Sequence, residues 1–328
     1  MSGVDHGTLR ISVIIASRNT RQLTVDCLAS LAEAAPSRPY EIIVVDNASS
    51  DGTVDAIRTR FPQVRIIECQ ENLGLAQANN LGAAEASGEL MLFLNSDTLV
   101  PPQALSRLAA PFEADPRIGI AAPRLVRPDG RVQGTASFLM TPLTVLLPTA
   151  RRRAKKAIGR AVQGSGSLAG IAYFCGAAVM VRREAFEAVG GFDPSFFFYC
   201  EDPDLCKRLA DGGWDLAFVP ETAIVHVGAS SSKSIRIGAD IERNRGRCHY
   251  IRKHFGPVPA AIVGFVLFFS AAAQAALNTL GVVVTAGLCR SFRDRALLNG
   301  AACLWFVLGL PRRERWIYRK LFGNWQKA

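Results

Sequence analysis

Short apolar segments alternate with segments of helical periodicity through the first hundred residues. Apolar runs of strand length predict four buried strands, at residues 11–16, 41–45, 64–68 and 90–94. Between these runs, apolar residues at helical spacing predict a helix that includes residues 23–31 and an alanine-rich helix at residues 75–86. This alternation implies an α/β fold, a parallel sheet wrapped by helices with ligands at the carboxyl ends of its strands.

The pattern becomes mixed after Pro102. Further elements are predicted as a helix near residues 104–112, strands at 118–122, 172–181 and 223–227, and an acid-led helix at 203–210. Residues 135–167 are the least regular part of the chain, being apolar, then strongly basic, then rich in glycine and serine. We interpret that part as a mobile loop near a membrane.

The C-terminal part differs in character, because residues 255–289 contain no charged side chain. A second uncharged run, residues 296–311, is slightly short for a membrane span. A helical hairpin dipping into a bilayer, interfacial helices and buried helices of a homo-oligomer all fit this pattern. We favour membrane association and leave spanning open. The predicted division is a catalytic domain at residues 1–254 and an apolar, basic helical extension at residues 255–328.

Charge is unevenly distributed in this chain of 328 residues, whose formal net charge is +10. Residues 151–160 hold six basic residues and no acid, and residues 290–328 hold nine basic and two acidic residues. A nucleic-acid-binding face more often interleaves basic with aromatic residues, whereas here the excess flanks apolar sequence. We therefore expect an anionic membrane surface as partner and no nucleic acid.

Cysteine usage and the N-terminal sequence indicate the compartment. The eight cysteines form no CxxC pair and several sit in apolar runs, which is typical of buried thiols in a reducing compartment. Residues 1–10 contain no apolar segment of the kind found in signal peptides. We expect the catalytic part at the cytoplasmic face of the cell membrane.

Carboxylates follow two of the predicted strands. Asp46 begins an acceptor-rich turn and can either cap that turn or accept a hydrogen bond from a pyrimidine N3–H or a ribose hydroxyl. Asp97 follows another buried strand and is either a loop residue or a ligand for Mg²⁺ or Mn²⁺ that bridges a diphosphate. Neither GxGxxG nor GxxxxGK[ST] is present, so a dinucleotide fold and a P-loop are disfavoured.

Three further carboxylates crowd the start of the helix predicted at residues 203–210. Glu201, Asp202 and Asp204 follow an aromatic run, where repulsion and poor solvation give folding little reason to place them. The simpler alternative is that Asp202 and Pro203 form an N-cap and first helical position. His226 lies in an apolar strand, where a histidine is more often a core residue than a ligand.

The ordered set of these motifs resembles family 2 glycosyltransferases of the GT-A fold, and most closely the bacterial rhamnosyltransferase type. The resemblance covers about residues 11–255 and rests on Ser17-Arg18-Asn19, Asp46-Asn47-Ala48-Ser49, Glu71-Asn72-Leu73-Gly74, Asn79-Asn80, Asn95-Ser96-Asp97, Phe174-Cys175-Gly176-Ala177, Gly190-Gly191-Phe192-Asp193 and Glu201-Asp202-Pro203-Asp204.

The resemblance implies a role for each matched position. Asp202 would be the general base, and Glu201 and Asp204 would orient the acceptor or the base. Asp97 would end the family's metal-binding DxD element, completed by His226 as in some relatives. Donor binding would involve Ser17, Arg18, Asp46, Asn72, Asn79, Asn95 and Asp97. Asn95 departs from the first Asp of DxD, so we expect a weaker metal site.

The implied reaction is inverting transfer from a nucleotide diphosphate sugar to a lipid-linked saccharide, with L-rhamnose from dTDP-rhamnose as our first hypothesis. Another donor sugar, such as galactofuranose, glucose or N-acetylglucosamine, is the main alternative. A catalytically silent scaffold and a nucleotidyltransferase are further alternatives, but the latter lacks its glycine-rich basic loop after the first strand. The QxxRW element of processive synthases is absent, which favours single or few additions.

Overall fold

The computed structural model describes the backbone of residues 9–34, 39–163, 172–228, 236–286 and 288–308, and their side chains except at 159–163, 236–238 and 304–308. Its strands are β1 Ile11–Ser17, β2 Tyr40–Asp46, β3 Arg65–Glu68, β4 Leu90–Asn95, β5 Thr98–Leu99, β6 Ile118–Val126, β7 Val132–Gln133, β8 Ala136–Phe138, β9 Ala172–Phe174, β10 Ala178–Arg182 and β11 Asp215–His226. Its helices are α1 Arg21–Glu33, α2 Thr53–Arg60, α3 Leu75–Glu85, α4 Ala104–Ala114, α5 Pro142–Leu146, α6 Pro148–Gln163, α7 Arg183–Ala188, α8 Glu201–Asp211, α9 Arg236–Phe255, α10 Pro257–Val284 and α11 Arg290–Leu308.

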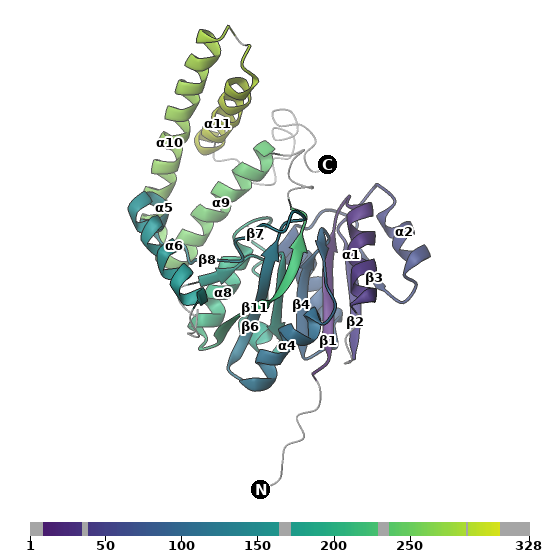
Figure 1. The fold of residues 1–328 in the computed structure, drawn as a ribbon. Helices are drawn as coiled ribbons and strands as arrows, with labels where there is room; N and C mark the ends of the chain where they lie inside the picture. The colour runs from purple at the N-terminus through teal and green to yellow at the C-terminus, as the bar shows by residue number, and fades with distance from the viewer. Residues whose placement is uncertain (1–8, 35–38, 164–171, 229–235, 287, 309–328) are drawn as a thin grey trace. The chain divides into compact units, whose positions relative to one another are not determined.

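A mixed sheet forms the centre of the first part of the chain (Figure 1). Its strand order is β3-β2-β1-β4-β10-β6-β11-β5, and β7 pairs with β6. The four strands predicted in the first hundred residues are parallel, as expected, whereas β10 runs antiparallel to both β4 and β6. The order of β3, β2, β1 and β4 brings the carboxyl ends of four parallel strands to one edge.

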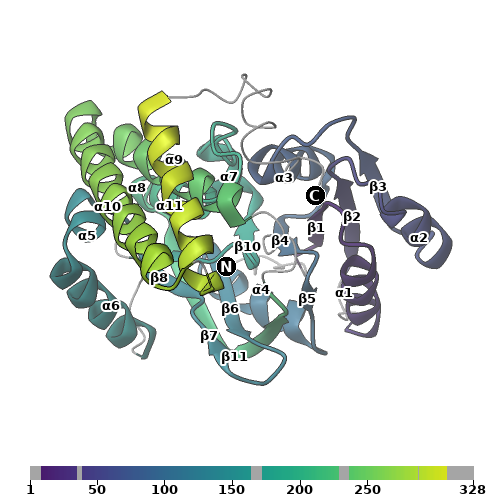
Figure 2. The ribbon, with the colours of Figure 1, turned by 90° about the horizontal axis from the view of Figure 1, so that it is seen from above.

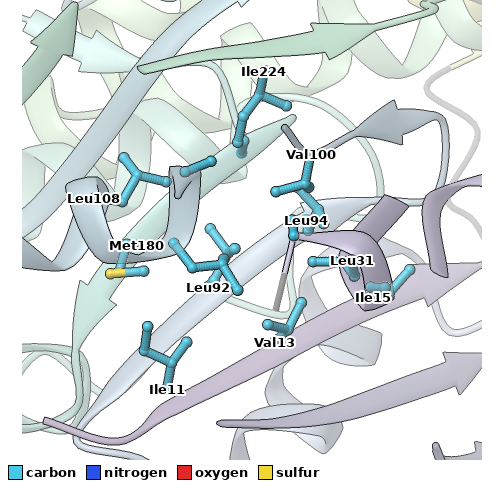
Figure 3. Close-up of a cluster of buried hydrophobic side chains, with 14 of the residues drawn as sticks. Ile11, Val13, Ile15, Leu31, Leu92, Leu94, Val100, Leu108, Met180 and Ile224 are labelled. Atoms are coloured by element: carbon cyan, nitrogen blue, oxygen red, sulfur yellow. The ribbon is translucent and has the colours of Figure 1, made fainter. Parts of the chain in front are cut away.

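Helices cover both faces of this sheet, with α1 and α4 on one face and α3 and α7 on the other (Figure 2). Side chains alternate between the two faces along each strand, so Val13 and Leu92 face the first pair of helices whereas Ile14 and Phe93 face the second. Figure 3 shows the first cluster, in which Leu31 of α1 and Leu108 of α4 pack over the strands. These two apolar layers hold the strand ends in place.

The single strand predicted at residues 172–181 is in fact two strands, β9 and β10, separated by Cys175, Gly176 and Ala177. The two strands belong to different sheets, since β9 pairs with β8 and β10 joins the central sheet. The apolar pattern runs through both strands, which is why sequence alone did not reveal the break. The break matters because it exposes the backbone N–H of Gly176 to a side chain from α8.

The prediction of a mobile loop at residues 135–167 is wrong for its described part, which forms β8, α5 and α6. Thr141 starts α5 with a capping box, its hydroxyl accepting from the N–H of Thr144 while the Thr144 hydroxyl accepts from the N–H of Thr141. Residues 164–167 lie outside the described residues.

The chain divides into two compact units. The first contains residues 1–139, 152–197 and 201–230, and the second contains residues 140–151, 198–200 and 231–328. Within the second, α10 packs against α5, α9 and α11. The domain division predicted at residues 254–255 stays a prediction.

Helix α10 is the one described helix that is long and apolar enough to cross a membrane, with a mean hydropathy of 2.0 over its best window. Only 17% of that window is buried within the protein. Its exposed side chains include Ile262, Phe265, Phe269 and Leu280. A helix that is apolar and exposed lacks the covering that apolar surface requires in water.

Candidate active site

The predicted donor-binding residues follow the parallel strands. Asp46 is the last residue of β2 and is paired in register with Ser17, the last residue of β1. Asn95, the last residue of β4, is paired with Ala16 on the other side of β1. The structure therefore places all three residues at the same edge of the sheet, as the sequence predicted.

Asp46 carries a free acceptor at this edge. Its side chain is 3% exposed, and its Oδ2 accepts a hydrogen bond from the N–H of Ser49 at 2.9 Å. Its Oδ1 is buried, and no described residue offers it a hydrogen bond. A buried carboxylate oxygen without a donor costs free energy unless a ligand supplies one. This geometry suits an incoming N–H or O–H group.

Ser17 and Arg18 hold the donor loop together. The Ser17 hydroxyl is buried and bonds the hydroxyls of Thr20 and Thr24 at 3.0 and 2.8 Å, so our expectation that it contacts the donor does not fit this geometry. Arg18 donates from Nη1 to the carbonyls of Asn47 and Ala48 at 2.8 and 3.0 Å. Arg18 therefore supports the turn that follows Asp46, whereas the Ser17 hydroxyl bonds the start of α1.

Asn47, to which the sequence motifs assigned no role, connects two loops in the structure. Its Nδ2 donates to Asn72 Oδ1 at 3.0 Å, and its Oδ1 accepts from the N–H of Leu73 at 2.8 Å. Asn47 thereby ties the loop before α3 to the end of β2. Asn79 lies buried on α3.

Asp97 and His226 are brought together, although 129 positions separate them in the sequence. Thr98 and His226 pair between β5 and β11, which places His226 Nε2 3.3 Å from Asp97 Oδ1. His226 Nδ1 lies 3.1 Å from Gln133 Oε1 on β7. In the tautomer that carries its proton on Nδ1, His226 donates to this amide oxygen and directs the lone pair of Nε2 toward Asp97. Gln133 had no signal in the sequence, since it lies on a two-residue strand.

This pair fits a divalent cation. A lone pair and a carboxylate that face each other are both satisfied by a positive ion between them. One carboxylate and one imidazole would leave the remaining positions for diphosphate and water, the coordination that Mg²⁺ and Mn²⁺ favour. Among the described side chains, no group of three His, Cys, Asp or Glu residues is arranged to hold a metal without such outside ligands.

Asp202 contacts the segment that separates β9 from β10. Its Oδ2 accepts a hydrogen bond from the N–H of Gly176 at 2.9 Å. Helix α8 begins at Glu201, so Asp202 lies inside the first turn and does not act as the N-cap that we considered. Burial raises the pKa of Asp202 to about 6, while the Gly176 N–H opposes that shift. A carboxylate with this pKa is ionised at neutral pH and still basic enough to accept a proton.

The two neighbouring carboxylates differ from Asp202. Asp204 is fully buried and accepts a 2.7 Å hydrogen bond from Arg208 Nε on the next turn of α8. It therefore stabilises the helix, and its predicted contact with acceptor does not fit a fully buried side chain. Glu201 is also buried, and burial together with the charge of Asp202 raises its pKa well above the ordinary value.

The turn before α8 has an unusual backbone. Tyr199 and Cys200 have φ angles of +71° and +73°, a region that non-glycine residues rarely occupy. Within the second unit, Arg243 of α9 lies over the Tyr199 ring at 4.8 Å from its centroid. Strained backbone of this kind persists where surrounding contacts hold it and is common beside functional residues.

A chain of backbone contacts joins the acid residues. The N–H of Asn95 at the end of β4 donates to the carbonyl of Ala177 at 2.9 Å, and the adjacent Gly176 binds Asp202. Burial raises the pKa of the Cys175 thiol to about 12, and the proximity of Asp202 and Asp97 acts in the same direction. Asp97 and Asp202 therefore both lie close to Cys175.

Comparison with solved structures places this fold among GT-A glycosyltransferases. The chain is similar to a mannosyltransferase from Pyrobaculum calidifontis in complex with GDP-Man and Mn²⁺, with a TM-score of 0.56, 20% identity and coverage of 92% of this chain and 88% of that one. It is also similar to GalNAc-T7 with UDP, GalNAc and Mn²⁺, with a TM-score of 0.57, 16% identity and coverage of 97% and 59%.

The chain belongs to glycosyl transferase family 2, whose model matches residues 12–190. The model of the N-terminal domain of galactosyltransferase also matches residues 160–228. One curated relative is the N-acetylglucosaminyl-diphospho-decaprenol L-rhamnosyltransferase of Mycobacterium tuberculosis, 32% identical over 221 residues that cover 62% of this chain and 72% of that protein. These findings confirm the family resemblance and the α/β fold, and the protein is a glycosyltransferase.

A methyl group at Gly176 tests whether the position of Asp202 matters. A Cβ at this position would overlap Asp202 Oδ1 and lie 2.8 Å from its Cγ, so Gly176→Ala should displace the carboxylate and lower kcat by about 10²-fold, the scale expected for a misplaced catalytic group. Gly134→Ala is the control, since a Cβ there meets nothing within 4 Å. Equal sugar-transfer rates for the two variants would contradict the role of this hydrogen bond.

Proposed function

We propose that the protein transfers a sugar from a nucleotide diphosphate donor to a lipid-linked saccharide acceptor, with inversion of the anomeric carbon. The observation that carries this proposal is the gathering of Asp46, Asp97 and Asp202 at one edge of the sheet, each with different partners. Asp46 supplies an acceptor, Asp97 a metal ligand and Asp202 a base. The catalytic work belongs to residues 1–254, and the apolar part of the membrane attachment belongs to residues 255–328.

Each residue has a defined task in this reaction. The free Oδ1 of Asp46 accepts a hydrogen bond from the base or ribose of the donor. Asp97 and His226 hold Mg²⁺ or Mn²⁺, which when bound stabilises the charge of the departing diphosphate. Asp202 takes the proton of the acceptor hydroxyl as that oxygen attacks the anomeric carbon. One base and one direct displacement give inversion.

The donor is expected to be dTDP-rhamnose, with the sugar passing to a precursor of cell-surface polysaccharide. Support comes from the rhamnosyltransferase of M. tuberculosis, whose name specifies a diphospho-decaprenol-linked N-acetylglucosamine and L-rhamnose. The alternatives are UDP-galactofuranose, UDP-glucose and UDP-N-acetylglucosamine on the same scaffold. Asp46 alone does not discriminate between thymidine and uridine nucleotides, because thymine and uracil share the N3–H group.

A donor panel tests this proposal. Binding and hydrolysis of each nucleotide sugar are measured with the full chain in Mn²⁺ or Mg²⁺, and again in EDTA. Metal-dependent selection of dTDP-rhamnose is the expected result. Selection of a UDP-sugar would replace rhamnose with that sugar, and no binding under any condition would indicate a silent scaffold.

Membrane association explains how a lipid-linked acceptor would reach the site. Helix α6 exposes Arg151, Arg152, Arg153, Lys155 and Lys156, while Ile158 is buried. Basic side chains near an anionic membrane each contribute about 1 kcal/mol of attraction. We infer that α6 and the apolar α10 attach the protein to the cytoplasmic face of the cell membrane.

Charge reversal on α6 is expected to weaken vesicle binding. The double variant Arg152→Glu, Lys156→Glu should bind vesicles with anionic lipid at least tenfold less tightly than wild type, because two attractions become repulsions. Arg60→Glu, Arg124→Glu makes the same charge change elsewhere on the surface and is the control. Co-sedimentation with anionic and neutral vesicles measures the effect, and equal loss in both variants would mean that α6 has no special role.

A further inference from the structure

Glu201 is a buried carboxylate that has no compensating cation among the described residues, and one of its oxygens also has no hydrogen-bond donor. Its side chain is 3% exposed, and its Oε2 is buried without a hydrogen-bond partner among the described residues. The carboxyl receives a hydrogen bond from its own backbone N–H. Asp204, by contrast, is matched by Arg208 at 2.7 Å. An uncompensated buried carboxylate is costly to ionise.

The groups around Glu201 add no positive charge. Asp202, the next residue, is a like charge that makes ionisation of Glu201 still less favourable. The thiols that face this pair, Cys175 before β10 and Cys206 on α8, have pKa values raised by burial to about 12 and remain neutral at physiological pH. The charge of Arg208 is directed to Asp204. Glu201 and Asp202 are adjacent, buried from solvent and without a cation, so we expect the two carboxyls to share a single negative charge.

We propose that Glu201 is a neutral carboxylic acid at the working pH and keeps the negative charge of the pair on Asp202. Glu201 is then a positioning residue, because it acts on the reaction through the charge of its neighbour Asp202. This assignment rests on the proposed base role of Asp202 for its catalytic meaning, whereas the protonation state of Glu201 stands independently. The role differs from direct orientation of the acceptor, which needs an accessible side chain.

Glu201→Gln is the direct test, because an amide has nearly the size of a neutral carboxyl and cannot ionise. The variant should retain kcat within about threefold, and its activity should fall with acid near the pKa of Asp202, as in wild type. Glu201→Ala, which also removes packing, should be worse than Glu201→Gln. A loss of 10²-fold or more in a folded Glu201→Gln protein would show that an ionised Glu201 is needed and would overturn the proposal.

Stability against pH gives a second readout that needs no activity. A carboxyl whose pKa is higher in the folded than in the unfolded protein stabilises the fold in acid and loses that contribution as pH rises. The folding equilibrium of wild type should therefore weaken relative to Glu201→Gln by up to about tenfold per pH unit above the ordinary pKa of glutamate. A difference that does not change with pH would overturn the proposal, even if no donor were ever found.

Asp204→Asn is the contrasting variant. It also removes a buried carboxylate from α8, but one whose partner Arg208 would be left buried without its ion pair. We expect Asp204→Asn to lower the melting temperature at all pH values from 6 to 8, whereas Glu201→Gln should not. Equal destabilisation by both variants would mean that Glu201 is ionised and paired in the folded protein.

Discussion

Replacing Asp202 with asparagine is expected to lower kcat by about 10²–10⁴-fold while donor affinity stays unchanged. Asparagine keeps the size of the side chain and its hydrogen bond from Gly176, but it cannot take a proton. The expected loss is the usual contribution of a general base and corresponds to about 3–5 kcal/mol of transition-state stabilisation. Donor affinity should stay because Asp46, at the end of β2, and Asp97, in the turn between β4 and β5, bind the nucleotide and diphosphate.

The pH dependence of wild type should agree with this assignment. A base with a pKa of about 6 is unprotonated above that pH, so kcat should fall about tenfold per unit as pH drops below 6. Single-turnover transfer and calorimetric donor titration separate the chemical step from binding. Asp211→Asn, an exposed acid at the other end of α8, is the control and should behave as wild type. Wild-type turnover by Asp202→Asn would exclude Asp202 as the base.

The place where the parallel strands end could be predicted from sequence, because the apolar pattern of a strand is a local signal. Asp46 and Asn95 each end an apolar run, and parallel strands must present such ends together. The family motifs fall in the same segments, so the first half of the fold could be predicted from sequence.

Contacts between distant segments were not accessible in this way. The hydrogen bond from Gly176 to Asp202 depends on a break within an apolar run, and the contact between Gln133 and His226 joins residues 93 positions apart. Helix α6 was not predicted, because its basic residues were interpreted for their charge and not for their helix propensity. Arginine, lysine and alanine are good helix formers. The different environments of Asp202, Asp204 and Glu201 could not be predicted either. These three acids look alike in sequence, and burial in the folded protein distinguishes them.

Removal of the Asp97 carboxylate is expected to abolish metal-dependent donor binding. In Asp97→Ala, His226 would be the one remaining protein ligand described here, and an imidazole alone binds Mg²⁺ or Mn²⁺ weakly. Mn²⁺ should then no longer increase the affinity for nucleotide sugar. The structure contributes the geometry behind this expectation, because it places His226 Nε2 3.3 Å from the carboxylate that is removed.

Gln133→Ala provides a graded comparison for this prediction. It leaves both ligands in place and removes the group that orients His226, a change that typically lowers metal affinity 10–100-fold. Calorimetric titration of donor at increasing Mn²⁺ should therefore rank wild type, Gln133→Ala and Asp97→Ala in that order. Unchanged titration in Asp97→Ala would rule out this metal site. An effect of Gln133→Ala as large as that of Asp97→Ala would mean that His226 contributes as much to metal affinity as the carboxylate does.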